Sequence, residues 1–407
     1  MPRILLPGRS EALTLTRPGW AASYPPPSSR RVYGAAHVAA RAGGPANCTA
    51  GAVGGNVIDW DATMGFRDHL WAHGFGIAEA MDTSQRGMGL SWAVAQELIT
   101  RSAERLAKHL AAGTLPGGPA TPPGGLATRP IGTTSALACG AGTDQLAGGE
   151  QHSLATIARA YQEQIEFVQG AGADVILMAS RALAASASSA QDYLDVYSDL
   201  LEQAERPVIL HWLGDAFDPA LRGYWGGDDF EAASDTVLEL IERAGPKVDG
   251  IKLSVLDASK EVALRRRLPA GVRMYTGDDF NYGELILGDA EGHSDALLGI
   301  FAAIAAPAAA ALRALDLGDV AGYQAAMAPT VPLSRVIFEE PTYHYKVGVA
   351  FLAWLNGLQP EFAMVGGLER RRSTGHLIRV FELAAAAGAL TEPELAVAKM
   401  NELLEVA

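Results

Sequence analysis

The sequence has few cysteines and few basic residues. Cys48 and Cys139 are its two cysteines, too few for a disulfide framework or a structural zinc site, and we expect both to be small buried apolar side chains. Its 46 acidic residues outnumber 32 basic ones, which gives a net charge of −14. No basic run with interleaved aromatic residues occurs, so the sequence argues against nucleic-acid binding.

Long apolar runs are also missing. Residues 1–20 lack the basic, apolar and small-residue segments of a signal peptide, and the Ala-rich run at 302–311 is too short to span a bilayer. We therefore expect a cytoplasmic protein with no membrane partner. The chain has 407 residues, of which 49% are hydrophobic and 19% charged, as in a globular enzyme. A barrel domain of about 250 residues would leave room for terminal additions.

Short apolar runs alternate with amphipathic stretches through the middle of the chain, a pattern typical of βαβ units and a parallel sheet. The runs predict strands at residues 32–38, 76–81, 134–140, 173–179, 207–212, 248–253, 272–276 and 294–299. The stretches between them predict helices at 59–73, 92–110, 153–170, 191–204, 235–244, 260–267 and 282–288. Eight strands alternating with helices predict an α/β protein with a (β/α)₈ TIM barrel.

The segments outside this alternation predict the domain organisation. Residues 1–31, which include three consecutive prolines, form an extended N-terminal arm, and residues 32–300 form the barrel. A Gly- and Pro-rich stretch at 113–129 is a surface insertion in the barrel. Residues 301–407 form a helical C-terminal extension. Its helices are predicted at 308–315, 320–327, 345–355, 377–387 and 392–406.

Polar side chains follow the predicted strands, and barrel enzymes carry their active sites at the carboxyl ends of the strands. Lys252 ends an apolar strand, where desolvation disfavours the ammonium ion, lowers its pKa and makes the amine a nucleophile for carbonyl compounds. The alternative is a lysine that reaches solvent or pairs with Asp278 or Asp279. Further polar residues at strand ends are His37, Glu79, Asp82, Thr83, Ser84, Arg86, Asp144, Arg181 and His211.

Five segments, taken in order, carry a resemblance to a known family. They are Thr83-Ser84-Gln85-Arg86-Gly87-Met88-Gly89-Leu90-Ser91, Pro207-Val208-Ile209-Leu210, Gly250-Ile251-Lys252, Thr276-Gly277-Asp278-Asp279 and residues 341–357. The chain from about residue 32 to 357 thereby resembles the dihydrodipicolinate synthase / N-acetylneuraminate lyase superfamily of class I aldolases. No single segment is specific, but their shared order is.

The resemblance implies a covalent mechanism without a cofactor. Lys252 corresponds to the Schiff-base lysine of this superfamily, and Thr83 and Ser84 correspond to two threonines that hold a substrate carboxylate. The Gly-Asp-Asp motif places Asp278 and Asp279 among the residues that bind substrate. Members of the superfamily usually associate, so a homodimer or homotetramer is expected.

The departures from the family pattern concern the lining of the pocket. His211 stands where the family has a proton-transferring tyrosine, and histidine can transfer protons near neutral pH. Arg86 replaces part of a Gly-Glu pair and could contact an anion with two hydrogen bonds. Arg181 replaces a frequent tyrosine. The chain thus looks like a divergent branch whose substrate is neither aspartate semialdehyde nor sialic acid.

The leading hypothesis is a Schiff-base lyase, an aldolase or a dehydratase, acting on a small 2-keto acid or sugar-derived carbonyl compound. Lys252 and His211 would be catalytic. The substrate would contact Thr83, Ser84, Arg86, Arg181, Asp278, Asp279, His37 and Asp144.

Two alternatives remain open. One is a metal-dependent sugar isomerase or epimerase barrel, although the sequence lacks a compact ligand motif. Its candidate ligands are His37, Glu79, Asp82, Asp144, His211 and Asp278. The other is a ligand-binding barrel without activity, supported by the missing tyrosine.

Several of these residues also have purely structural interpretations. Asp279, Thr83 and Ser84 can each cap a following helix or turn. His37, inside a predicted strand end, can be a hydrogen-bonded core histidine.

Overall fold

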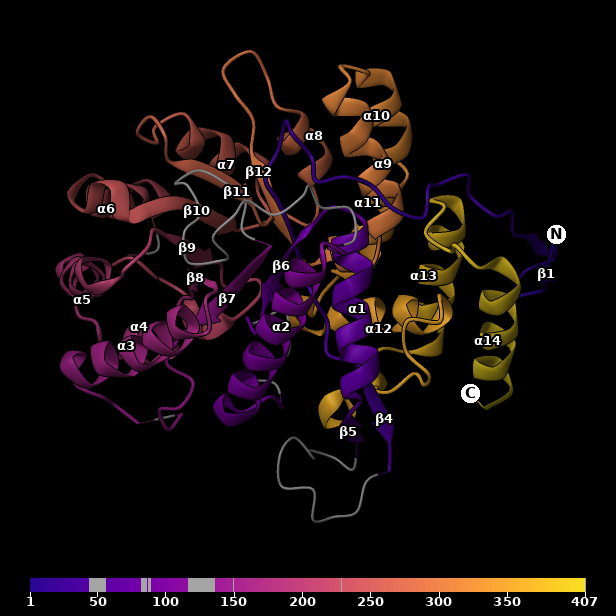
Figure 1. Ribbon diagram of the computed structural model, residues 1–407, viewed down its shortest axis with the longest axis horizontal. Helices are drawn as coiled ribbons and strands as arrows, with labels where there is room; N and C mark the ends of the chain where they lie inside the picture. The colour runs from indigo at the N-terminus through magenta and orange to yellow at the C-terminus, as the bar shows by residue number, and fades with distance from the viewer. Residues whose placement is uncertain are drawn as a thin grey trace.

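The computed structural model describes residues 1–43, 56–81, 86, 89–115, 136–148, 150–227 and 229–406. Eight parallel strands close into a barrel in the order β10-β11-β12-β3-β6-β7-β8-β9 (Figure 1). They are β3 (Val32–Ala35), β6 (Gly76–Glu79), β7 (Leu137–Ala141), β8 (Asp174–Leu177), β9 (Val208–Leu213), β10 (Val248–Ser254), β11 (Arg273–Thr276) and β12 (Asp295–Leu298). The prediction of a TIM barrel is confirmed, and each of the eight barrel strands overlaps a predicted one.

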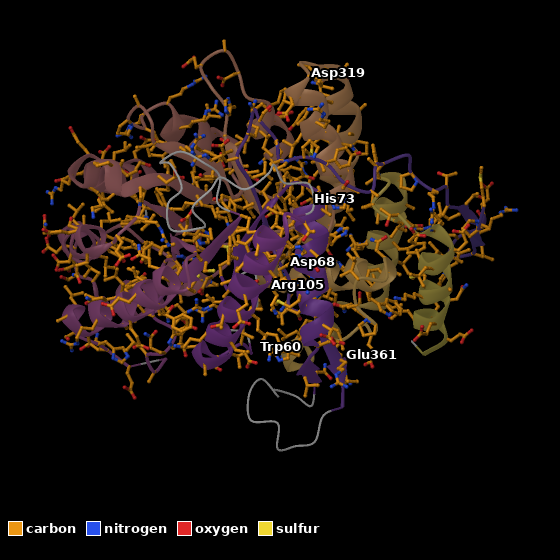
Figure 2. The ribbon with its side chains drawn as sticks, in the orientation of Figure 1. Trp60, Asp68, His73, Arg105, Asp319 and Glu361 are labelled. Atoms are coloured by element: carbon orange, nitrogen blue, oxygen red, sulfur yellow. The ribbon has the colours of Figure 1, made fainter. Side chains whose placement is uncertain are left out.

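The helices around the barrel also follow the predicted alternation. They are α1 (Trp60–Ala72), α2 (Trp92–Ala112), α3 (Leu154–Gly170), α4 (Arg181–Ser186), α5 (Ala190–Gln203), α6 (Phe230–Ala244), α7 (Ala258–Arg265) and α8 (Tyr282–Leu287). The six-residue helix α4 was not predicted, since one and a half turns carry too little periodicity. Adjacent helices are also joined by charge: Asp68 of α1 pairs with Arg105 of α2, and Figure 2 shows the two side chains next to each other.

The strands are buried on both faces, because one face fills the barrel and the other contacts the helices. Inward-facing residues recur at every second position and form a separate interior cluster that includes Tyr33, Ala78, Ile209 and Tyr275. The register then determines what lies above this layer. Ile209 is opposite Gly250, and two residues further His211 is opposite Lys252, so both polar side chains also face inward.

The C-terminal extension is helical, as predicted, and includes one helix that was not anticipated. Its helices are α9 (Ala305–Asp316), α10 (Val320–Met327), α11 (Thr330–Ile337), α12 (Lys346–Leu355), α13 (Thr374–Ala386) and α14 (Pro393–Val406). The unanticipated helix α11 contains Pro332, which reads as a helix breaker in sequence. Here it lies in the first turn, where a missing N–H removes no helical hydrogen bond.

The N-terminal segment contains a small hairpin in place of a wholly extended arm. Strand β1 (Arg3–Ile4) pairs with β2 (Leu13–Thr14), and Figure 1 shows β1 beside α14 at one side of the molecule. Arg9 pairs with Glu382 of α13, and the Trp20 indole N–H donates to the Gly388 carbonyl at 2.8 Å. A second hairpin, β4 (Ala40–Ala42) with β5 (Asn56–Ile58), follows β3. In the part of the chain that the structure describes, no helix has the length and apolar character needed to cross a membrane.

Candidate active site

Lys252 lies inside the mouth of the barrel, 3% exposed, near the carboxyl end of β10. A glycine on the neighbouring strand end makes room for it. A Cβ atom at Gly277 would lie 2.9 Å from Lys252 Cε and would also collide with the Ser254 hydroxyl. The Gly277 N–H meanwhile donates to the Leu253 carbonyl at 2.8 Å. The glycine of the Gly-Asp-Asp motif therefore lets β11 continue past the lysine without covering it.

His211 is the inward neighbour of Lys252 on β9. Its Nε2 atom lies 3.3 Å from the Ser254 hydroxyl of β10, and both side chains are buried. The strand register places this imidazole directly beside the lysine. A group that can donate or accept a proton thus lies next to a buried amine, as proton transfer during carbonyl chemistry requires.

The two adjacent aspartates after β11 have different surroundings. Asp278 accepts hydrogen bonds from the backbone N–H groups of Phe280 and Asn281, at 2.8 and 3.0 Å, and one from the Asn281 side-chain amide at 2.8 Å. These bonds stabilise the turn before α8, so the capping interpretation left open for Asp279 applies to Asp278 instead. Burial raises the pKa of the Asp278 carboxyl.

Asp279 is close enough to Lys252 for their charges to interact. Its carboxylate accepts the Ile300 N–H at 2.9 Å, and only 4% of the residue is exposed. Burial raises its pKa to about 7, while that hydrogen bond and the charges of Lys252 and Lys346 act to lower it. A carboxyl group that titrates near neutral pH therefore lies within electrostatic reach of two buried amines.

Lys346 was not among the predicted site residues. It is the first residue of α12, is 4% exposed, and its ammonium donates to the Ala35 carbonyl of β3 at 3.2 Å. The other nine residues of α12 are buried and uncharged, so a lysine at the start of such a helix was the available signal. It lies within the segment 341–357, one of the five that carry the family resemblance.

His37 occupies a core position behind this lysine. Its Nε2 atom is 2.5 Å from the Gln359 side-chain oxygen, and its ring packs edge-on against Phe66. Complete burial, together with the charges of Lys346 and Arg67, lowers its pKa to about 3. The imidazole is therefore neutral. It is fully buried, and its Nδ1 atom has no hydrogen-bond partner within the part of the chain that the structure describes.

The Arg86 guanidinium is bonded to groups of the barrel itself. It donates to both Asp144 carboxylate oxygens, to the Gln164 side chain at 2.6 Å, and to the carbonyls of Ala80 and Gly140 at 2.9 and 2.8 Å. These five bonds account for its five N–H groups. The expected bidentate contact with a substrate anion is therefore corrected, because Arg86 anchors the segment after β6 to β7.

Asp144 is the carboxylate partner of that arginine. Burial alone would raise its pKa, but the Arg86 charge and the hydrogen bonds from Arg86 and Gln164 hold it below its ordinary value. Arg181 begins α4 and is 57% exposed, with its Nε bonded to Asp218 at 2.5 Å. Thr83 and Ser84 lie outside the described residues, as does Asp82.

A cavity of about 580 Å³ opens at the carboxyl ends of β7, β8 and β9, next to His211. Its wall is formed by the segments that follow these strands and by α4. The described lining residues are Arg86, Gly142, Thr143, Asp144, Leu146, Ala147, Gly148, Glu150, Gln151, Met178, Ala179, Ser180, Arg181, Ala182, Ala185, His211, Leu213, Asp218, Ala220 and Leu221.

The acidic and imidazole residues at the strand ends do not converge. Within the described ranges no three His, Cys, Asp or Glu side chains are grouped as ligands for one metal ion. Glu79 points outward, where Arg67 binds it through two hydrogen bonds of 2.7 Å and Ser102 donates to it at 2.6 Å. Among the described members of the ligand set proposed for a metal-dependent isomerase, Glu79 and Asp144 are thus bound in separate structural contacts.

Comparison with solved structures agrees with the architecture. A dihydrodipicolinate synthase from Oceanobacillus iheyensis matches with a TM-score of 0.59 and 16% identity, covering 88% of this chain and 96% of that one. The dihydrodipicolinate synthase from Acinetobacter baumannii in complex with pyruvate matches with a TM-score of 0.60 and 17% identity, covering 89% of this chain and 100% of that one. The 4-hydroxy-tetrahydrodipicolinate synthase from Methylacidiphilum fumariolicum SolV matches with a TM-score of 0.59 and 17% identity, covering 92% of this chain and 99% of that one.

These likenesses define the class of protein: a TIM barrel with the fold of the dihydrodipicolinate synthases and a buried lysine on its sixth barrel strand. The predicted resemblance is confirmed at the level of the fold, and identities of 16–17% agree with a divergent branch. A comparison with curated proteins finds no match. Residues 7–407 match the family described as "Protein of unknown function (DUF993)", and the chain belongs to that family.

Proposed function

We propose that this protein is a class I aldolase-type lyase in which Lys252 forms a Schiff base with a small 2-keto acid or sugar-derived carbonyl compound. The observation that carries the proposal is the position of Lys252: inward-facing, 3% exposed, and next to His211 and Asp279. An amine adds to a carbonyl carbon in its neutral form, so a neighbouring group that accepts the ammonium proton is part of the proposal. No cofactor is required for this chemistry.

The reaction begins when the Lys252 nitrogen adds to the carbonyl carbon. Loss of water then forms a C=N⁺ bond, which withdraws electrons from the adjacent carbon. Either a neighbouring C–C bond breaks, or a hydroxyl group leaves from the next carbon after proton removal. His211 exchanges the proton with the enamine, and Asp279 accepts a proton from the lysine ammonium.

The proposal also assigns the remaining groups. Thr83 and Ser84 would hold the carboxylate of the substrate, as their counterparts do in the family that the sequence resembles. Arg181 could assist at the rim if its pair with Asp218 opens. We also propose that the chain divides into residues 1–31, 32–300 and 301–407. A cytoplasmic location and association into a homodimer or homotetramer are proposed as well. Sedimentation of the purified protein tests the last.

Borohydride trapping with pyruvate tests the covalent step. Reduction during incubation should leave a stable pyruvyl adduct, which peptide mass spectrometry locates at Lys252. The Lys252→Arg variant should lose the adduct. Lys260→Arg changes a half-exposed lysine of α7 and should retain it. An adduct at Lys346, or one that survives in Lys252→Arg, would overturn the assignment. Pyruvate binding without any adduct would favour a ligand-binding barrel.

A further inference from the structure

The cavity beside His211 lies between the ends of three strands. Thr143 follows β7, Met178 and Ser180 follow β8, and Leu213 ends β9. His211 belongs to the cavity wall and is also the strand neighbour of Lys252. A substrate joined to the lysine through its carbonyl carbon can therefore place its remaining chain past the imidazole into this space.

The two positive charges on the described cavity wall are already paired with carboxylates. Arg86 and Arg181 are the cations among the described lining residues. Asp144 pairs with the first, which has all five N–H groups engaged, and Asp218 pairs with the second. Glu150 adds a negative charge. An anionic group on a ligand would thus lose its hydration here without gaining a cation.

The rest of the wall is largely apolar. Leu146, Met178, Ala182, Leu213 and Leu221 contribute aliphatic surface. The hydroxyls of Thr143 and Ser180 lie 2.6 Å apart and bond each other, and the Ser180 hydroxyl also accepts the Leu183 N–H at 3.0 Å. These hydroxyl groups are already hydrogen-bonded within the protein, so a ligand in the cavity does not need polar groups to bond them.

We infer that this cavity determines substrate specificity by receiving an uncharged, predominantly apolar arm of the carbonyl substrate. The inference rests on the proposed function and narrows its substrate class. It favours 2-keto acids with an alkyl chain over sugar phosphates and dicarboxylic keto acids, whose distal anions would meet paired arginines.

A chain-length series measures this preference. Straight-chain 2-keto acids from pyruvate to 2-ketohexanoate are compared by the concentration that gives half-maximal borohydride trapping at Lys252. Each buried methylene contributes ~0.8 kcal/mol, which corresponds to about a fourfold lower concentration per added carbon. 2-Ketoglutarate, of similar length, should require at least about tenfold more than 2-ketohexanoate. Equal values along the series, or stronger trapping of 2-ketoglutarate, would overturn the inference.

Variants of the cavity wall test the location. Ala185 is an exposed lining residue of α4, and Ala185→Phe should abolish the advantage of 2-ketohexanoate over pyruvate. Ala182→Leu narrows the same wall and should reduce that advantage. The control is Ala232→Phe, which changes an exposed alanine of α6 outside the cavity and should keep it. Thermal unfolding identifies any variant that fails to fold. An unchanged advantage in both folded cavity variants refutes the location.

Failure of the Schiff-base proposal has a different signature. If no keto acid is trapped, calorimetric binding of the corresponding 2-hydroxy acids still reports on the cavity, because binding needs no covalent bond. Tighter binding with longer chains, lost in Ala185→Phe, would then support the cavity and reject the amine chemistry. Binding that does not change with chain length would reject the cavity.

Discussion

Replacing Asp279 by asparagine should remove a pH dependence of stability that the wild-type protein carries. The pKa of Asp279 is raised from 3.8 to about 7, a shift that corresponds to ~4 kcal/mol. In the folded protein the carboxyl is protonated at pH 5, whereas in the unfolded chain it is ionised. Its contribution to stability is therefore fully present below pH 3.8 and is lost as the pH rises through about 7.

The magnitude follows from the two pKa values. Between pH 5 and pH 8 this group alone should lower the free energy of unfolding of the wild type by about 2–3 kcal/mol relative to Asp279→Asn. Asparagine keeps an oxygen that can accept the Ile300 N–H, so the hydrogen bond to the backbone is conserved.

Urea unfolding of both proteins at pH 5, 6.5 and 8 measures the difference. Asp215→Asn serves as a control, because it removes a carboxylate that is 51% exposed on the surface. Parallel pH dependences for the wild type and Asp279→Asn would refute the reasoning, since they would mean that the carboxyl is ionised in both states. In Asp279→Asn, the rate of borohydride trapping at Lys252 should also lose the part of its pH dependence that lies near pH 7.

Three further predictions concern other buried polar groups. Glu261 is 1% exposed, and burial raises its pKa to about 8. Its contribution to stability is therefore present below pH 4.5 and is lost as the pH rises through about 8. The melting temperature of Glu261→Gln should fall less from pH 7 to pH 9 than that of the wild type. Arg86→Lys cannot replace five fixed hydrogen bonds and should lower the free energy of unfolding by about 2–3 kcal/mol in urea titrations; an unchanged value would contradict its anchoring role. His211→Asn should slow deuterium exchange into the methyl group of pyruvate, followed by NMR, by about 10²–10⁴-fold while the borohydride adduct at Lys252 still forms. Exchange at the wild-type rate would exclude His211 as the proton carrier.

The candidate site was only partly predictable. Lys252 and His211 were found because the alternation of buried strands places polar residues at strand ends, and a barrel gathers those ends at one mouth. Asp278 and Asp279 could not be told apart, since the direction of the turn decides which carboxylate caps the backbone before α8 and which interacts with the charge of Lys252. Lys346 was missed because α12 returns to the barrel from a distant part of the chain.

Sequence alone determined the eight strands, the helices between most of them and the lysine on the sixth, because each depends on periodicities of two or 3.6 residues within a short segment. Tertiary structure alone decided which polar groups remain available to a ligand. Arg86 looked like an anion-binding residue until Asp144, Gln164 and two backbone carbonyls converged on it from separate elements. A buried donor is satisfied by whatever acceptors the fold brings within about 3 Å of it, and that distance is not encoded in local sequence.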